Sequence, residues 1–154
     1  MYKLYPESFH ELTDSQTISN YIHGGRGIVK LEAPSGKSHK YVFSKPEDKY
    51  SFPDDVIFVY ALHEEKPDVY KKFYVGMIEG NSFRLTRNSR FLHDTEIVRG
   101  AAHIMNMANN PNLRTKMKLY HCGMCCFCGR QLSSEKSMKS GVGPRCKKRL
   151  TERH

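Results

Sequence analysis

The cysteines of this chain have the spacing of a metal site. All five lie in the last 33 residues, whereas a disulfide framework normally spreads an even number along a chain. Cys125 and Cys128 form a CxxC pair, which presents two thiolates from one tight turn, and Gly129 follows where such a turn needs a positive φ. Cys146 follows Pro144, and proline favours the first position of a helix. We therefore expect a zinc knuckle that faces a third thiolate at the start of a terminal helix.

A tetrahedral zinc ion needs a fourth ligand, and the residues leave several alternatives open. His121 is best placed, because it precedes the CxxC pair by four residues at the end of a predicted strand. Cys122 is the next candidate, and His154 is a further one. Cys126 lies inside the turn and would have to point away from the metal. A redox CxxC motif is the alternative to a metal site, but it is typical of a neighbouring βαβ unit, which the chain does not indicate.

The acids near the cysteines do not fit a catalytic zinc site. Catalytic zinc needs an open coordination position and a nearby carboxylate or histidine that acts as a base. Between residues 116 and 154 the only acids are Glu135 and Glu152, and neither stands in an HxE or HExxH motif. We therefore expect a structural zinc ion and no enzymatic activity. Metal binding would replace the hydrophobic core that so short a segment cannot form.

Positive charge is concentrated in the same half of the chain. Residues 1–79 hold 10 Lys and Arg against 12 Asp and Glu, which gives −2, whereas residues 80–154 hold 15 against 4, which gives +11. Basic clusters neutralise phosphates, so DNA or RNA is the expected partner, and a solvated surface is the alternative. The candidate contact residues are Arg84, Arg87, Arg90, Lys116, Lys118, Phe127, Arg130, Lys136, Lys139, Arg145, Lys147, Lys148 and Arg149.

Phe127 and the run Lys147 to Arg149 also have explanations that need no nucleic-acid partner. Phe127, at the tip of the knuckle, is expected to stack on a base, and packing beneath the knuckle is the alternative. The run Lys147 to Arg149 follows Cys146 on the predicted terminal helix. The negative end of a helix dipole favours cations there without any partner.

The elements that must position these residues are mostly strands. Short β-rich runs with no helix between them favour an antiparallel meander over a parallel sheet. The predicted strands are residues 27–33, 39–44, 56–63, 73–79, 82–86 and 116–120, and the predicted helices are residues 13–24 and 95–108. The second helix has apolar residues at the spacing of one buried face, so it should pack on the sheet. The fold class is therefore α+β, with a body of residues 1–112 and a zinc-finger-like module of residues 113–154.

The string CxxCGRxL, followed by Ser137 and GxGPxC, with His121 upstream, resembles a family of small proteins of unknown function found mainly in bacteriophages. Lys37, the strand 74–76 and the stretch 83–90 resemble the body of the same family. The resemblance implies a β-rich domain joined to a zinc-finger-like tail. It also implies that His121, Cys125, Cys128 and Cys146 are the metal ligands. It implies no biochemical activity.

These patterns support two hypotheses for function. The first is a zinc-stabilised, non-enzymatic protein that binds DNA or RNA with limited sequence specificity. The second is a protein–protein effector that binds a host or viral nucleic-acid-handling enzyme or a defence complex. No apolar run is long enough to span a membrane, and the first residues lack the apolar centre of a secretory signal. We therefore expect a cytoplasmic protein of an infected bacterial host, with neither a membrane partner nor a small-molecule substrate.

Overall fold

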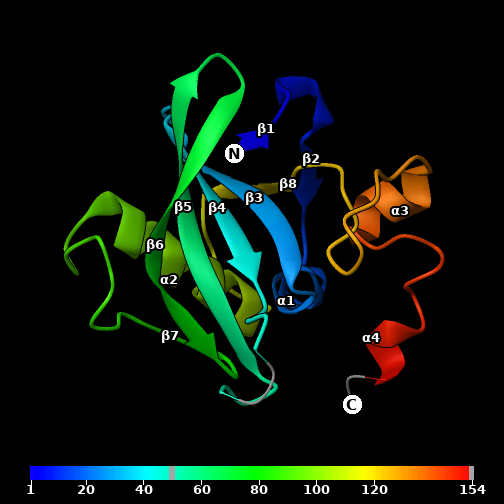
Figure 1. Cartoon of the computed structure of the whole chain (residues 1–154). Helices are drawn as coiled ribbons and strands as arrows, with labels where there is room; N and C mark the ends of the chain where they lie inside the picture. The colour runs from blue at the N-terminus through cyan, green and yellow to red at the C-terminus, as the bar shows by residue number, and fades with distance from the viewer. Residues whose placement is uncertain (49–50, 153–154) are drawn as a thin grey trace.

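The computed structural model describes residues 1–48 and 51–152 and shows one curled antiparallel sheet, two helices behind it and a cysteine-rich module at its side (Figure 1). The strands are β1 (Tyr2–Lys3), β2 (His10–Leu12), β3 (Arg26–Glu32), β4 (Ser38–Ser44), β5 (Val56–Lys66), β6 (Val69–Glu79), β7 (Ser82–Arg84) and β8 (Lys118–His121). The helices are η1 (Pro6–Ser8), α1 (Ser15–His23), α2 (Glu96–Asn109), α3 (Glu135–Ser140) and α4 (Arg149–Glu152).

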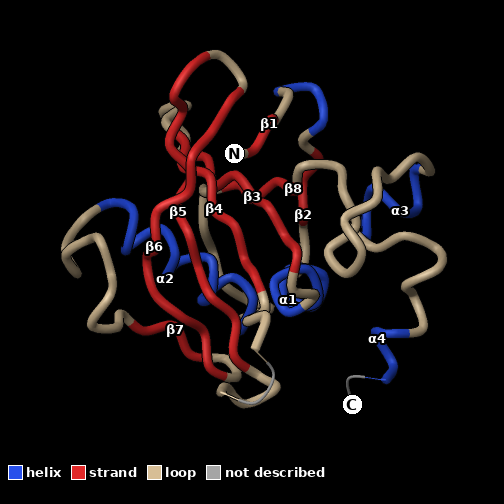
Figure 2. The backbone as a smooth tube through the Cα atoms, viewed as in Figure 1, coloured by secondary structure: helices blue, strands red, loops and turns tan. Residues whose placement is uncertain are grey.

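The predicted α+β class and the antiparallel meander are confirmed. The strand order is β1-β6-β5-β4-β3-β8-β2, and β7 pairs with β6, so β3 to β7 follow one another as consecutive hairpins (Figure 2). Strand β8 lies between β3 and β2. The chain therefore returns to the sheet before the cysteines, and β8, which lies within the predicted module of residues 113–154, is a strand of the body's sheet. We call residues 122–152 the module and the described residues before them the body.

Helices α1 and α2 pack on one face of the sheet, and each begins at a residue whose side chain caps it. The backbone N–H of Thr17 donates to Asp14 Oδ1 at 2.9 Å at the start of α1, and Val98 donates to the Thr95 hydroxyl at 3.4 Å at the start of α2. The apolar side of α2, including Ile104, is buried against the sheet. The long predicted helices are thus confirmed to within one or two residues at most ends.

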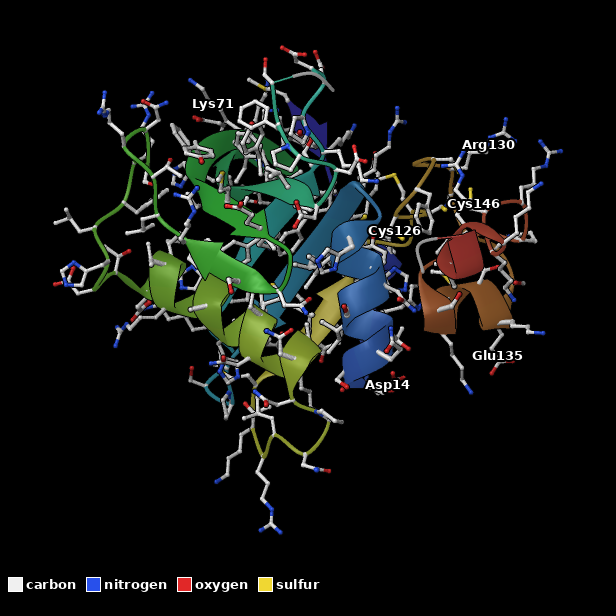
Figure 3. The ribbon with its side chains drawn as sticks, turned by 90° about the horizontal axis from the view of Figure 1, so that it is seen from below. Asp14, Lys71, Cys126, Arg130, Glu135 and Cys146 are labelled. Carbon is white, nitrogen blue, oxygen red and sulfur yellow. The ribbon has the colours of Figure 1, made fainter. Side chains whose placement is uncertain are left out.

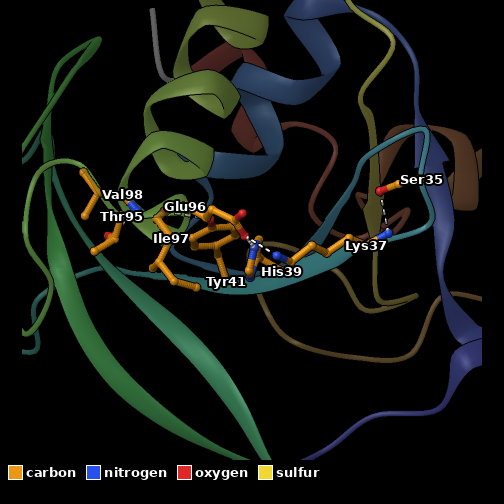
Figure 4. A network of polar contacts seen from close by, with 8 residues as sticks. All are labelled: Ser35, Lys37, His39, Tyr41, Thr95, Glu96, Ile97 and Val98. Atoms are coloured by element: carbon orange, nitrogen blue, oxygen red, sulfur yellow. Dashed lines mark hydrogen bonds and ion pairs between the residues drawn. The ribbon is translucent and has the colours of Figure 1, made fainter.

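A polar network fastens α2 to β4 (Figure 4). The Tyr41 hydroxyl donates to the carbonyl of Ile97 at 2.7 Å, and burial raises the pKa of Tyr41. The Glu96 carboxylate accepts from Lys37 Nζ at 2.8 Å and from His39 Nε2 at 3.3 Å. These contacts hold the pKa of Glu96 below its ordinary value, Lys37 being the larger cause. The network ties the first turn of α2 to the sheet.

Apolar residues line both faces of the sheet. The main core lies between the sheet and the two helices and includes Val29, Phe43 and Ile104. On the opposite face, Leu4 and Phe9 of the N-terminal segment pack over Ile28 of β3 and neighbouring residues. No helix in the described part of the chain has the length and apolar character that crossing a membrane requires.

Candidate metal centre and basic cleft

Three cysteines of the module form a candidate metal site. The Sγ atoms of Cys125, Cys128 and Cys146 all lie within 4.8 Å of one another. Tetrahedral zinc with bonds of about 2.3 Å to sulfur needs thiolates roughly 3.8 Å apart, so small side-chain rotations suffice. Gly129 has φ +75°, and its N–H donates to the carbonyl of Cys125 at 2.9 Å, which closes the predicted turn. The donor set therefore suits a thiophilic metal ion.

The charge state of the cluster depends on its backbone donors. Burial opposes ionisation of Cys125, but N–H groups of Gly143, Cys128 and Phe127 outweigh it and hold the pKa of Cys125 below its ordinary value. Burial and then the neighbouring thiols raise the pKa of Cys146 to about 11. Three thiolates this close repel one another, so a divalent cation would be needed to keep all of them deprotonated.

The geometry does not bring His121 to the three thiols. Its ring is buried between Tyr21 and His10, with ring centroids 5.2 and 5.7 Å away. Nε2 donates to the carbonyl of Met138, and Nδ1 accepts from the N–H of Gly123 at 3.0 Å. Both ring nitrogens are therefore engaged away from the cysteines. In this structure His121, the predicted fourth ligand, does not join the three cysteines, because its ring points from β8 toward Tyr21 of α1.

The other candidates for the fourth ligand also lie elsewhere. Cys122 belongs to the apolar cluster on the opposite face of the sheet, with Leu4 and Ile28. Cys126 is buried and its thiol faces the carbonyl of Asn20 on α1 at 3.8 Å. His154 lies outside the described residues. Among the side chains that the structure describes, in residues 1–48 and 51–150, those close enough to share one metal ion are the three cysteines.

Cys146 differs from its prediction in one respect. Residues 144–148 form turns, and α4 begins only at Arg149, so this cysteine precedes the terminal helix.

A pocket of about 230 Å³ opens beside the cluster and is lined in part by Arg130, Ser137 and Arg145. Figure 3 shows Arg130 and Cys146 together in the module and Cys126 on the side of the module that faces α1.

The module is docked on the turn between α1 and β3. The N–H of Arg26 donates to the carbonyl of Cys126 at 2.9 Å, and its guanidinium donates to the carbonyl of Cys128 at 3.1 Å. A Cβ at Gly24 would lie only 2.5 Å from Cys126 Sγ. The Tyr21 hydroxyl donates to the carbonyl of Met124 at 3.0 Å. The body therefore fixes the orientation of the CxxC turn.

A basic cleft lies where the module meets the body. Its volume is about 500 Å³, and it is lined by Gly24, Gly25, Arg26, Ser44, Lys45, Glu47, Phe127 and Arg149. The Arg149 guanidinium lies 5.7 Å from the centre of the half-buried Phe127 ring. The Phe127 ring packs against the main core, as the packing alternative expects, and it also lines the cleft.

Sequence reasoning missed Arg26 and Lys45. Pairing of β3 with β4 brings them together, and the N–H of Lys45 donates to the carbonyl of Gly25 at 3.2 Å. The glycine-rich run Gly24 to Gly27 is a sequence signal that could have drawn attention to this turn. It does not match a phosphate-binding glycine loop, because such a loop follows a strand instead of leading into one.

The predicted basic residues do not form one surface. Arg84 on β7, with Arg87 and Arg90 in the loop after it, lies at the edge of the sheet opposite the module, and Arg84 pairs with Glu79 at 3.4 Å. The others lie on or near β8 and the module: Lys116, Lys118, Arg130, Lys136, Lys139, Arg145, Lys147, Lys148 and Arg149. The two basic groups thus lie at opposite edges of the sheet.

Residues 120–151 match a protein family of unknown function, DUF6011. The match covers about a fifth of the chain and contains all three clustered cysteines. The resemblance to a family of unknown function is thus confirmed for this segment. No curated protein and no solved structure matches the chain.

Proposed function

We propose that this chain is a zinc-stabilised protein that binds nucleic acid with limited sequence specificity at the basic cleft. The observation that supports this most strongly is the arrangement of the cleft: three cations and one aromatic ring around a hollow of about 500 Å³. That volume lies within the range of roughly 300–1,000 Å³ that is typical of ligand pockets. The proposed role is binding, and it requires no reaction at the metal.

The cleft has the groups that a nucleotide needs. Arg26, Lys45 and Arg149 present three positive charges against the single carboxylate of Glu47. Cations of this kind neutralise phosphates regardless of sequence. The Phe127 ring lines the cleft and offers a face for a base, and the Arg149 guanidinium lies 5.7 Å from the ring centre. Phosphate and base recognition can therefore occur side by side.

Zinc has a structural role in this proposal. Cys125, Cys128 and Cys146 would hold it, and the bound ion would link the CxxC turn to the loop before α4. Phe127 lies in the CxxC turn and Arg149 directly follows the loop, so that link would keep both residues in the lining of the cleft. The metal and the cleft are thus coupled through the backbone.

Fluorescence anisotropy with a labelled 20-nucleotide oligonucleotide tests the proposal. A double variant, Lys45→Gln with Arg149→Gln, should lower affinity about ten-fold at low salt and flatten the salt dependence. Lys136→Gln with Lys139→Gln on α3 makes the same change in net charge outside the cleft and should change affinity little. Absence of binding by the unaltered protein at low salt would overturn the proposal and favour a protein partner. Equal losses in the two double variants would overturn the assignment to the cleft.

A further inference from the structure

The face of the sheet turned away from α1 and α2 carries aromatic and cationic side chains in ordered rows; we call it the outer face. Strand register places Arg26, Ser44, Phe58, Met77 and Arg84 in one row across β3, β4, β5, β6 and β7. Residues that oppose one another in this way share one face. The first residue of the row also lines the basic cleft, so the two surfaces are continuous.

The next row adds tyrosines. Ile28, Val42, Tyr60 and Tyr74 stand opposite one another in β3, β4, β5 and β6. The register shift between Val59 and Tyr60 marks a bulge in the β5–β6 pair, so Tyr74 and Met77 both reach the outer face although two residues separate them. The N-terminal segment covers Ile28 and Val42 but leaves the tyrosines half-buried.

Four aromatic rings on the outer face form a continuous series of ring–ring contacts. Phe52 meets Phe58 with 5.1 Å between ring centroids, Phe58 meets Tyr74 at 6.0 Å, and Tyr74 meets Tyr60 at 5.7 Å. All three contacts are edge-to-face, so neighbouring rings present faces in different directions. Each of these four rings keeps part of its surface in solvent.

Lysine side chains lie beside the aromatic rings of the outer face. The ammonium group of Lys72 lies 4.4 Å from the centre of the Tyr60 ring. Register places Lys30, Lys40, Leu62 and Lys72 in a third row. Burial, and after it the nearby charge of Lys30, lowers the pKa of Lys40. Like charges directly opposite one another cost stability unless an anion lies near them. Glu32 offsets part of this charge through its ion pair with Lys30 at 3.6 Å, whereas Glu79 pairs with Arg84 in the first row at 3.4 Å.

We propose that the outer face binds single-stranded nucleic acid, with unpaired bases stacked on Phe58, Tyr60 and Tyr74 and phosphates held at Lys72 and at the two ends of the first row. This inference rests on the proposed function and specifies its substrate class. Bases in a duplex are covered by their neighbours, whereas unpaired bases expose the flat faces that aromatic side chains bind. The first row spans five strands, so Arg26 and Arg84 stand about four interstrand spacings, or roughly 19 Å, apart. A path of that length holds several nucleotides and joins the two basic groups that the sheet separates.

A pair of adjacent lysines on β6 gives a matched test. Lys71 and Lys72 are both exposed, but they point to opposite faces, and Lys71 lies over Phe73 instead of Tyr60. Lys72→Gln should weaken binding of a labelled single-stranded 20-mer and reduce the slope of log K against log salt by about 0.7, as loss of one phosphate contact predicts. Lys71→Gln should leave both unchanged. An unlabelled single strand should compete at least about ten-fold better than a duplex of the same length.

A second measurement does not depend on variant folding. Ultraviolet cross-linking of the unaltered protein to a bromouracil-containing single strand, followed by peptide mass spectrometry, should label peptides that contain Tyr60 and Tyr74. If oligonucleotides bind but both lysine variants behave alike, or the cross-links fall only in residues 122–152, the outer face is not the binding site and the basic cleft alone is. If the duplex competes as well as the single strand, the substrate class is wrong. If no oligonucleotide binds, the proposed function fails together with this inference.

Discussion

The body and the module are stabilised by different interactions. In the body, a sheet and two helices bury long aliphatic and aromatic side chains such as Phe43, Ile57 and Ile104. In the described part of the module, the buried hydrophobic residues are Leu132, Val142 and four cysteines. Burial of apolar area stabilises the body without help, whereas so few apolar groups cannot offset the conformational entropy of about 30 residues. The module must therefore depend on its thiols and on its contact with the body.

The largest expected effect is on the module alone. Cys146→Ser, or removal of zinc with a chelator, should abolish metal binding and release the amide protons of residues 122–152 to rapid exchange. Binding of a structural zinc ion is worth roughly 10–16 kcal/mol in short peptides, and here that free energy would order the module. Hydrogen exchange followed by mass spectrometry measures this, with residues 27–44 as the internal control. Equal loss of protection in both regions would contradict the division into body and module.

A core substitution should have the opposite pattern. Ile104→Ala removes a fully buried side chain from the contact between α2 and the sheet, and we expect the free energy of unfolding to fall by about 2–5 kcal/mol. Chemical denaturation followed by circular dichroism measures the loss. Zinc content of the still-folded protein should stay unchanged. A variant that unfolds no more readily but loses zinc would reverse the roles assigned to the two regions.

The contact between the regions can be weakened by one methyl group. Gly24→Ala would place a Cβ 2.5 Å from Cys126 Sγ and 2.6 Å from the Cys126 carbonyl oxygen, so the module must shift. Overpacking of this kind costs about 1–3 kcal/mol. Gly36→Ala is the control, because no atom lies within 4 Å of the added Cβ, although its φ of +91° adds backbone strain. Oligonucleotide affinity should fall in the first variant more than in the second, and the reverse order would contradict the docking.

His121 provides the smallest and sharpest of these tests. Burial, with a smaller contribution from His10, holds the pKa of His121 below 6.5, although its contact with Met138 opposes the shift. His121 therefore binds a proton more readily in the unfolded chain than in the folded chain. As a result, the free energy of unfolding falls as the pH drops below about 6.5. His121→Gln should lose about 1–2 kcal/mol at neutral pH, show a weaker pH dependence of the unfolding midpoint and keep its zinc. Loss of zinc in this variant would mean that His121 is a metal ligand.

The spacing of residues in the sequence predicted those features of the fold and the site that depend on neighbouring residues alone. The CxxC turn, Gly129 and the three cysteines follow from short-range rules, and the antiparallel strands follow from the order of β-rich runs. The direction of the His121 ring does not, because it depends on which face of β8 turns toward α1 when β8 enters between β3 and β2. The basic cleft depends in the same way on pairing of β3 with β4, which sequence spacing does not reveal.

Zinc K-edge X-ray absorption on the reduced protein measures the number and type of ligands at the cysteine cluster. We expect one zinc ion per chain with three sulfur ligands at about 2.3 Å, and an unchanged sulfur shell in His121→Gln. Absence of zinc, or a shell with fewer than three sulfurs, would contradict the claim that Cys125, Cys128 and Cys146 together hold the metal that orders the module.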